Sequence, residues 1–132
     1  MSECVVDASA LVEALTGHSP AASTLRRRLT HTACHAPQLV DAEVGNVLRR
    51  LNRAAIITDD AAATALHALE DVIEYRYPNL GALAESAWAL RHTLTFYDAL
   101  YVALARSLEI PLLTGDRRLA AAAKQTCATE LI

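Results

Sequence analysis

The chain has 132 residues, of which 53% are hydrophobic and 20% charged, and its formal net charge is -3 at pH 7. This composition excludes a disordered chain and favours a single helix-rich globular domain over residues 1–132, because a chain of this length buries roughly 70% of the surface that its unfolded form exposes. No apolar stretch approaches the roughly 20 residues that cross a bilayer, and no secretory signal is present, so we expect a cytoplasmic protein that makes no membrane contact.

Short apolar runs alternate with longer helical stretches along the chain. Ser19 and Pro20 suit the cap and the first residue of one helix, and Thr58 suits the cap of another. Pro37 is predicted to open the longest helix. In chain order, the predicted elements are a strand at residues 4–6, helices at 8–15 and 20–29, a strand at 32–36, helices at 37–54 and 59–72, a strand at 74–77, helices at 80–91 and 97–108, a strand at 112–114, a helix at 117–125 and a last edge strand at 129–132.

Strands that alternate with helices imply a parallel sheet with helices on both faces, joined by right-handed crossovers. Ligands in open sheets of this kind gather outside the carboxyl ends of the strands. Asp7 directly follows the first predicted strand, and Asp116 follows the strand at residues 112–114. Both side chains therefore belong at the same edge of the sheet.

Four carboxylates, Asp7, Glu43, Asp98 and Asp116, lie just beyond an apolar run or on the apolar face of a predicted helix. The three aspartates have an equally good capping interpretation, because Asp is preferred where helices begin and Thr95 with Asp98 fits a capping box. Glu43 has no such interpretation, and burying an isolated carboxylate costs several kcal/mol. An Arg partner that reaches into the core stays open, whereas the chain's single lysine lies near its far end.

Clustered carboxylates raise one another's pKa unless a cation is present, and hard oxygen ligands select Mg²⁺ or Mn²⁺ over zinc. Sulfur ligands are not indicated, because Cys4, Cys34 and Cys127 lack C-x-x-C spacing and are expected to be reduced and mostly buried. Asp41 lies on the opposite side of the helix that carries Glu43, so we expect it to be a surface acid.

Four segments, each with one of the four acids, stand together in order and spacing. They are V-V-D-A-S-A-L-V at residues 5–12, P-Q-L-V-D-A-E-V-G-N-V-L-R-R at 37–50, Y-D-A-L-Y-V-A-L-A at 97–105 and L-L-T-G-D-R-R-L at 112–119. In these segments the chain is similar to a PIN domain, and its short single-domain form resembles the VapC-type toxins of type II toxin–antitoxin pairs.

The resemblance implies a PIN-like three-layer α/β/α sandwich with a central, mainly parallel sheet, and a Mg²⁺- or Mn²⁺-dependent endoribonuclease. By position, it makes all four acids catalytic and metal-binding. Asp7 and Asp98 would be direct ligands, while Glu43 and Asp116 would bind a second ion, hold a water, or do both. Thr114 matches a hydroxyl position beside this site.

Other polar residues are expected around the site, each with an ordinary alternative. Ser9 and Asn46 could donate hydrogen bonds to the acids, although helix-terminal and helix-surface positions explain them equally well. Arg117 and Arg118, the basic residues closest in sequence to Asp116, are expected to position the RNA backbone. Charged clusters of this kind are also common on solvated helix faces.

The family also implies a cognate antitoxin that blocks the acidic site, and a second copy of the chain in a homodimer. Apolar stripes on the predicted helices at residues 37–54 and 59–72 could form such contacts, but core packing explains them equally well. The RNA substrate and both protein partners therefore enter as expectations from the resemblance.

Two other classes of protein share this length and architecture, with acids at strand ends. A receiver domain needs an acidic pair near the first strand and a lysine after a late strand, whereas a haloacid dehalogenase phosphatase needs a second aspartate where Ser9 stands. Neither pattern is present. An RNA-processing PIN nuclease that is not a toxin, and a catalytically silent module that binds RNA or protein, stay open as alternatives.

Overall fold

The structure is a computed structural model that describes residues 2–132, and its centre is a five-stranded sheet. The strands are β1 (Ser2–Val6), β2 (Thr32–Pro37), β3 (Tyr75–Tyr77), β4 (Leu112–Thr114) and β5 (Thr129–Leu131). Their order in the sheet is β3-β2-β1-β4-β5, and every neighbouring pair is parallel. The carboxyl ends of β1 and β4 therefore lie side by side at the middle of one edge.

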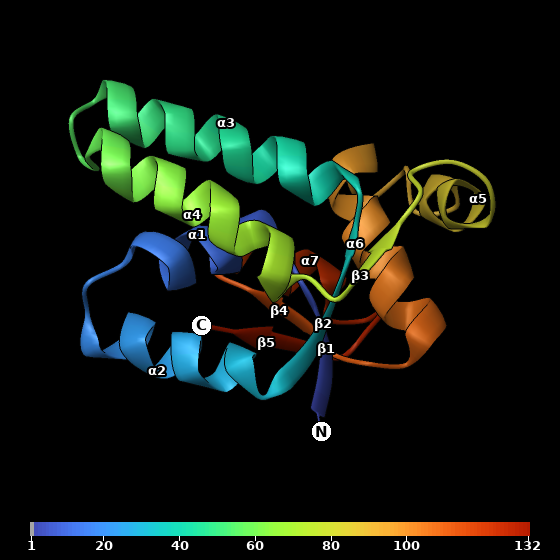
Figure 1. The fold of residues 1–132 in the computed structure, drawn as a ribbon. Helices are drawn as coiled ribbons and strands as arrows, with labels where there is room; N and C mark the ends of the chain where they lie inside the picture. The colour runs from blue at the N-terminus through green and yellow to red at the C-terminus, as the bar shows by residue number, and fades with distance from the viewer. Residues whose placement is uncertain (1) are drawn as a thin grey trace.

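Seven helices within the described residues cover the two faces of this sheet. They are α1 (Ala8–Thr16), α2 (Pro20–Thr30), α3 (Leu39–Arg53), α4 (Asp59–Val72), α5 (Ala82–Trp88), α6 (Phe96–Leu108) and α7 (Arg117–Ala123). Figure 1 shows α1, α2, α3 and α4 on one side of the sheet and α5, α6 and α7 on the other. The expected three-layer α/β/α sandwich is confirmed. Within residues 2–132, no helix combines the length and apolar character that crossing a membrane requires.

Strand β2 and helix α6 each contain a long unbroken run of buried residues. Every residue of β2 is buried, as expected for a parallel strand covered on both faces, and residues 99–105 of α6 are buried without a break. Helix α6 contacts β1, β2 and β4 on one side and α5 on the other. Asp98 precedes this buried run directly, so its position is fixed by the packing of the whole helix.

The predicted helix starts at Ser19, Thr58 and Thr95 are confirmed. The side chain of each of these residues accepts a hydrogen bond from a backbone N–H in the first turn of α2, α4 or α6. Asp7 and Asp116 cap α1 and α7 in the same way. A cap of this type stabilises a helix by about 1 kcal/mol.

Two predicted boundaries are wrong. Pro37 ends β2 instead of opening a helix: it pairs with Tyr77, and α3 begins only at Leu39. A proline is tolerated at such a strand end because it lacks only the N–H. Helix α5 is shorter than predicted, because Gly81 enters it with a φ of 75°, a left-handed conformation that favours glycine.

Two further predictions concern Asp41 and the cysteines. Asp41 is exposed in part but not free: both its carboxylate oxygens accept hydrogen bonds from Arg76, at 2.8 and 3.0 Å, which ties α3 to β3. The three cysteines are free thiols, as expected, and Cys4 and Cys34 are buried. The apolar stripes of α3 and α4 pack within the core and on each other.

Candidate functional site

The four acids reach the carboxyl edge of the sheet from four different elements. Asp7 and Asp116 follow β1 and β4, which are neighbours, and the Asp7 N–H donates to the carbonyl of Leu113 at 3.2 Å. Asp98 lies in the first turn of α6, and Glu43 lies in the second turn of α3. Residues separated by up to 109 positions are thus brought to one edge by the fold.

Asp7 is the most deeply buried of the four, with 5% of its surface exposed. Its Oδ1 accepts hydrogen bonds from Ser9 Oγ at 2.7 Å and from the Ala10 N–H at 3.0 Å, and its Oδ2 accepts one from the Thr114 hydroxyl. Burial raises the pKa of Asp7, the charge of Asp116 raises it further, and the three hydrogen bonds oppose the shift. The hydrogen bonds therefore fix the orientation of the Asp7 carboxylate, while burial makes its ionised form less favourable.

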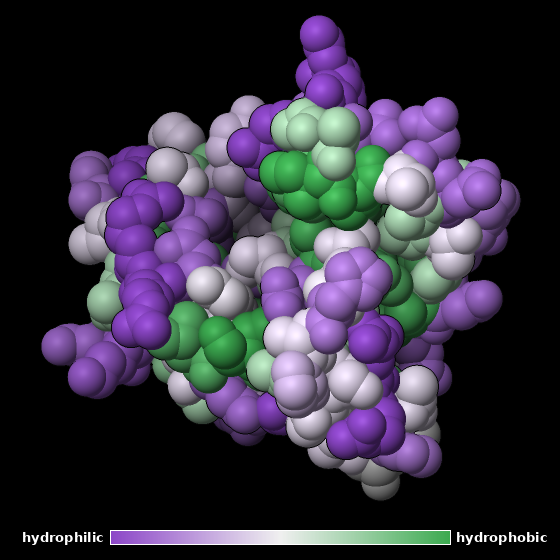
Figure 2. All heavy atoms as spheres, turned by 90° about the vertical axis from the view of Figure 1, so that its left-hand side faces the viewer, coloured by the Kyte–Doolittle hydropathy of each residue, from purple (hydrophilic) through white to green (hydrophobic). Residues whose placement is uncertain are grey.

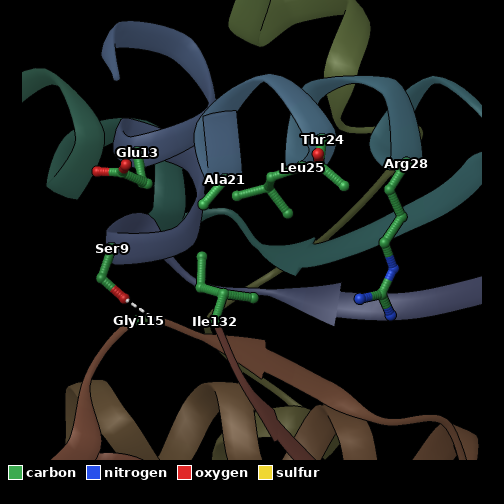
Figure 3. A pocket seen from close by; sticks show the side chains of 8 residues that line it. All are labelled: Ser9, Glu13, Ala21, Thr24, Leu25, Arg28, Gly115 and Ile132. Carbon is green, nitrogen blue, oxygen red and sulfur yellow. Dashed lines mark hydrogen bonds between the residues drawn. The ribbon is translucent and has the colours of Figure 1, made fainter. Parts of the chain in front are cut away.

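Ser9 and Thr114 link Asp7 to the loop that follows β4. The Thr114 hydroxyl accepts a hydrogen bond from the Asp116 N–H at 3.0 Å, and Ser9 Oγ accepts one from the Gly115 N–H at 2.9 Å, a contact drawn in Figure 3. The structure thus places both hydroxyls where the sequence predicted them. They hold the β1 and β4 ends of the site in one arrangement.

Glu43 is held by Tyr101, a residue that sequence reasoning missed. The Tyr101 hydroxyl donates to Glu43 Oε1 across the space between α6 and α3. Burial raises the pKa of Glu43, and the charges of Asp98 and Asp7 raise it further, while the Tyr101 hydrogen bond lowers it. One signal was available, because Tyr101 lies three residues after Asp98 and such pairs share a helix face.

Asp98 and Asp116 complete the acidic side of the site. Burial is the main cause that raises the pKa of Asp98; Arg118 lowers it and Asp116 raises it. Arg118 is 3.8 Å from Asp98 through its Nη2, and with 79% of its side chain exposed it forms a weak pair. Asp116 Oδ1 accepts the N–H groups of Arg118 and Leu119, so its capping role uses that oxygen.

Two of the predicted residues make no contact with the four acids, although the predicted contact of Arg117 is with the RNA backbone and stays a prediction. Asn46 is exposed on α3, one turn beyond Glu43, and Arg117 is exposed at the start of α7. Within residues 2–132, neither side chain forms a hydrogen bond or ion pair with any of the four acids. Arg118 is therefore the only one of the two predicted arginines that contacts an acid in the described part of the chain.

The donor set suits a hard divalent cation, because the acids and the hydroxyls around them offer oxygen alone. Three of the four carboxyl groups, Asp7, Glu43 and Asp98, have a raised pKa with burial as the first cause. We call these three the strained acids, because burial disfavours their ionised form. Within residues 2–132, no three His, Cys, Asp or Glu side chains are already spaced as a closed metal-binding group. The acids at this edge therefore affect one another through the electrostatic repulsion of their charges.

Two cavities open on the molecule, one beside this region and one away from it. One, of about 580 Å³, reaches from Ser9 and Gly115 along α2 to Arg28, with Leu25 and Ile132 on its apolar wall (Figure 3). Another, of about 570 Å³, lies between the α1–α2 and α3–α4 connections. Figure 2 views the molecule from that side and shows apolar side chains around a hollow surface. Apolar surface is thus available beside the acidic site.

Comparisons with known proteins place the chain in a family. Residues 4–125 match the family model of the PIN domain. Over all 132 residues the chain is 52% identical to Ribonuclease VapC1 of Mycobacterium tuberculosis, of which it covers 99%.

Two solved structures have the same fold. The structure of PAE2754 from Pyrobaculum aerophilum has a TM-score of 0.72 and 27% identity, with 97% of this chain and 83% of that chain covered. A structure of VapBC-5 from Mycobacterium tuberculosis, a member of the VapBC family of toxin-antitoxin systems, has a TM-score of 0.58 and 24% identity, with 100% and 98% covered.

Proposed function

Because the chain belongs to the PIN-domain family, we propose that it is a divalent-metal-dependent endoribonuclease and the toxin of a type II toxin–antitoxin pair. The observation that carries the proposal is the state of Asp7. A buried carboxylate whose pKa stays raised despite three hydrogen bonds is poorly explained by a helix cap alone. The name of the relative that is 52% identical, a ribonuclease, supports the reaction class.

Mg²⁺ or Mn²⁺ would be held first by Asp7 and Asp98. Asp116 and Glu43 would complete the negative charge around the ions, and neutralising this charge would favour the ionised forms of Asp7, Glu43 and Asp98. When bound, the ion supplies positive charge for the phosphoryl oxygens and lowers the pKa of a nearby water. Removing the metal should therefore abolish cleavage without unfolding the chain.

The chain's own residues orient the reaction. Ser9 and Thr114 keep Asp7 from rotating away from the edge of the sheet, and Tyr101 keeps Glu43 directed from α3 toward the same edge. Glu43 has the raised pKa of a proton acceptor and takes a proton from the attacking water. Attack of this water on phosphorus breaks the P–O3' bond, and the leaving 3'-oxygen takes a proton from solvent water, so that a 3'-hydroxyl and a 5'-phosphate remain. Arg118 supplies a flexible positive charge beside Asp98 for the RNA backbone.

A cognate antitoxin and a second copy of the chain are the proposed protein partners. The structural relative from a VapBC toxin-antitoxin system supports the first. The apolar cavity from Ser9 to Arg28 offers a partner a surface that touches the acidic site itself. A toxin implies a small antitoxin gene beside its own; co-expression with the product of that gene should suppress RNA cleavage, and sedimentation of the purified chain should report a dimer.

The test of this function is cleavage of a mixed cellular RNA pool by antitoxin-free protein, with Mg²⁺ or with chelator. Asp7→Ala and Asp98→Asn, each checked for fold by circular dichroism, should remove metal-dependent cutting. Asp60→Asn is the matched control, because Asp60 is an exposed acid in the first turn of α4, away from the four acids. If metal-supplied protein cuts nothing, or both site variants cut as the parent does, the silent binding module replaces the nuclease.

A further inference from the structure

We propose that an exposed aromatic surface next to Asp98 binds unpaired bases of the RNA substrate by stacking. This surface, the aromatic patch, consists of Trp88, Arg91, Phe96 and Tyr97. The inference rests on the proposed nuclease function, because it assigns the part of the same site that would hold substrate. It goes beyond that function by assigning the surface that holds the substrate's bases, which must be unpaired to stack on the rings.

The patch is an organised cluster rather than scattered exposed residues. Trp88, at the end of α5, is 58% exposed, and its ring lies 6.5 Å from that of Phe96 in an edge-on arrangement. The Arg91 guanidinium lies 4.9 Å from the centre of the Trp88 ring and donates through Nη1 to the Trp88 carbonyl at 3.0 Å. An aromatic ring and a cation are thus held together at the surface.

The core does not require these rings. In the same segment, Ala87, Leu94 and Ala99 are buried and supply the packing between α5, α6 and the rest of the core. Trp88 and Tyr97 stay mostly outside it, with Tyr97 61% exposed. Leaving an indole and a phenol in water forgoes the stabilisation that their burial would bring, so a ligand for them is the economical explanation.

The patch is continuous with the acidic site. Phe96 and Tyr97 immediately precede Asp98, and the Thr95 cap fixes all three in the first turn of α6. Arg118 approaches Asp98 from α7 with its side chain largely in solvent. Backbone phosphates near Asp98 would therefore meet Arg118, while the adjoining bases would meet the rings of the patch.

Single-stranded RNA fits this chemistry better than a second protein surface does. Every base offers a π-face to an aromatic ring or a guanidinium plane, and its phosphates require positive charge, which Arg91 and Arg118 supply. Duplex RNA keeps its bases stacked on one another and cannot use the rings. A second copy of the chain is the competing occupant, and the experiment below separates the two.

Trp88 is the chain's single tryptophan, so its fluorescence reports on the patch alone. The Asp7→Asn protein, which keeps the patch but should not cut, is titrated in Mg²⁺ with an unstructured oligoribonucleotide of about 12 nucleotides, a length within the range that single-strand sites cover. We expect saturable quenching with this strand and none with the same sequence as a duplex. Saturation by both forms, or by neither, would overturn the inference.

Variants then locate the binding. Tyr97→Ala and Arg91→Ala should weaken single-strand affinity by about 5- to 100-fold, the range expected for loss of one base-stacking partner, whereas Tyr97→Phe should restore it. Trp88→Ala, followed by anisotropy of labelled RNA, should behave like Tyr97→Ala. Ile56→Ala is the matched control, because Ile56 is 69% exposed on the distant α3–α4 connection and should have no effect.

Steady-state cleavage distinguishes failure of this inference from failure of the nuclease. With Asp7 intact, the patch variants should raise KM while kcat stays near that of the parent. A parent that cuts while all patch variants bind and cut like it would overturn the inference and leave the function standing. A parent that cuts nothing would overturn the function. If Trp88→Ala instead turns a dimer into a monomer in sedimentation and leaves RNA affinity unchanged, the patch is an interface between copies.

Discussion

Replacing Asp7 by asparagine should make the metal-free protein more stable while it abolishes nuclease activity. Burial raises the pKa of Asp7, and the hydrogen bonds from Ser9, Thr114 and the Ala10 backbone oppose this shift without cancelling it. The ionised form therefore costs folding free energy at pH 7 that a neutral side chain of the same shape avoids. A helix cap without a metal role would give the opposite result.

The expected magnitude follows from the contacts. Burying an ion costs several kcal/mol of folding free energy, and the hydrogen bonds to Asp7 offset most of this cost. Asparagine keeps an acceptor oxygen for Ser9 and Ala10 but presents an amide to the Thr114 hydroxyl, which sacrifices on the order of 1 kcal/mol. We expect a net gain on the order of 1 kcal/mol, or about 3 to 5 °C in Tm for a domain of this size.

Thermal unfolding in chelator at pH 7, and again with Mg²⁺, measures the effect. Mg²⁺ should raise the Tm of the parent and leave that of Asp7→Asn nearly unchanged, because binding stabilises only a fold that holds the ion. Asp60→Asn should respond to Mg²⁺ as the parent does. An Asp7→Asn protein that melts below the parent in chelator would refute the reasoning and show that Asp7 acts chiefly as a cap.

Three further predictions follow from other contacts. Because the Tyr101 hydrogen bond lowers the pKa of Glu43, Tyr101→Phe should move the acidic limb of the kcat–pH profile to higher pH and lower kcat/KM by about 10-fold. Because burial raises the pKa of the three strained acids, they destabilise the fold only where they are ionised: the fold suffers no penalty below their unfolded pKa of about 4, and it loses stability as pH rises through their folded pKa values. The Tm advantage of Asp7→Asn in chelator should therefore shrink as pH falls from 7 to 4.5. A constant Tm difference would contradict this sign. Arg76→Ala should destabilise the fold by about 1 kcal/mol in urea unfolding while metal-dependent cleavage of the folded protein persists, and lost cleavage in folded protein would place Asp41 and Arg76 in the site.

Local sequence patterns predicted most of the fold. Apolar runs located the five strands, and the caps at Ser19, Thr58 and Thr95 marked helix starts because their side chains satisfy free N–H groups of the first turn. Pro37 misled, because a proline suits both the first turn of a helix and the end of a strand. Only the pairing of Pro37 with Tyr77, a contact between distant segments, decides between them.

In the site too, local sequence features were predictable and contacts between distant segments were not. Asp7 and Asp116 could be found from their positions after strands, and all four acids from the family pattern, because both are properties of the sequence itself. The Tyr101 contact to Glu43 and the Arg76 contact to Asp41 could not, since each joins side chains 58 or 35 residues apart. The sequence left Asn46 either a donor to the acids or a helix-surface residue; Asn46 is exposed on α3, which favours the second alternative and depends on how α3 packs.

The most direct measurement of the central claim is the chemistry of the cut ends. RNA fragments produced by the parent with Mg²⁺, with Asp98→Asn and chelator reactions run in parallel, are tested for their terminal groups. Metal-assisted hydrolysis at the four acids predicts 3'-hydroxyl and 5'-phosphate ends that appear only with parent and metal. Cyclic 2',3'-phosphate ends, or equal cutting in chelator, would contradict the account, because they require attack by the ribose hydroxyl or catalysis without the ion.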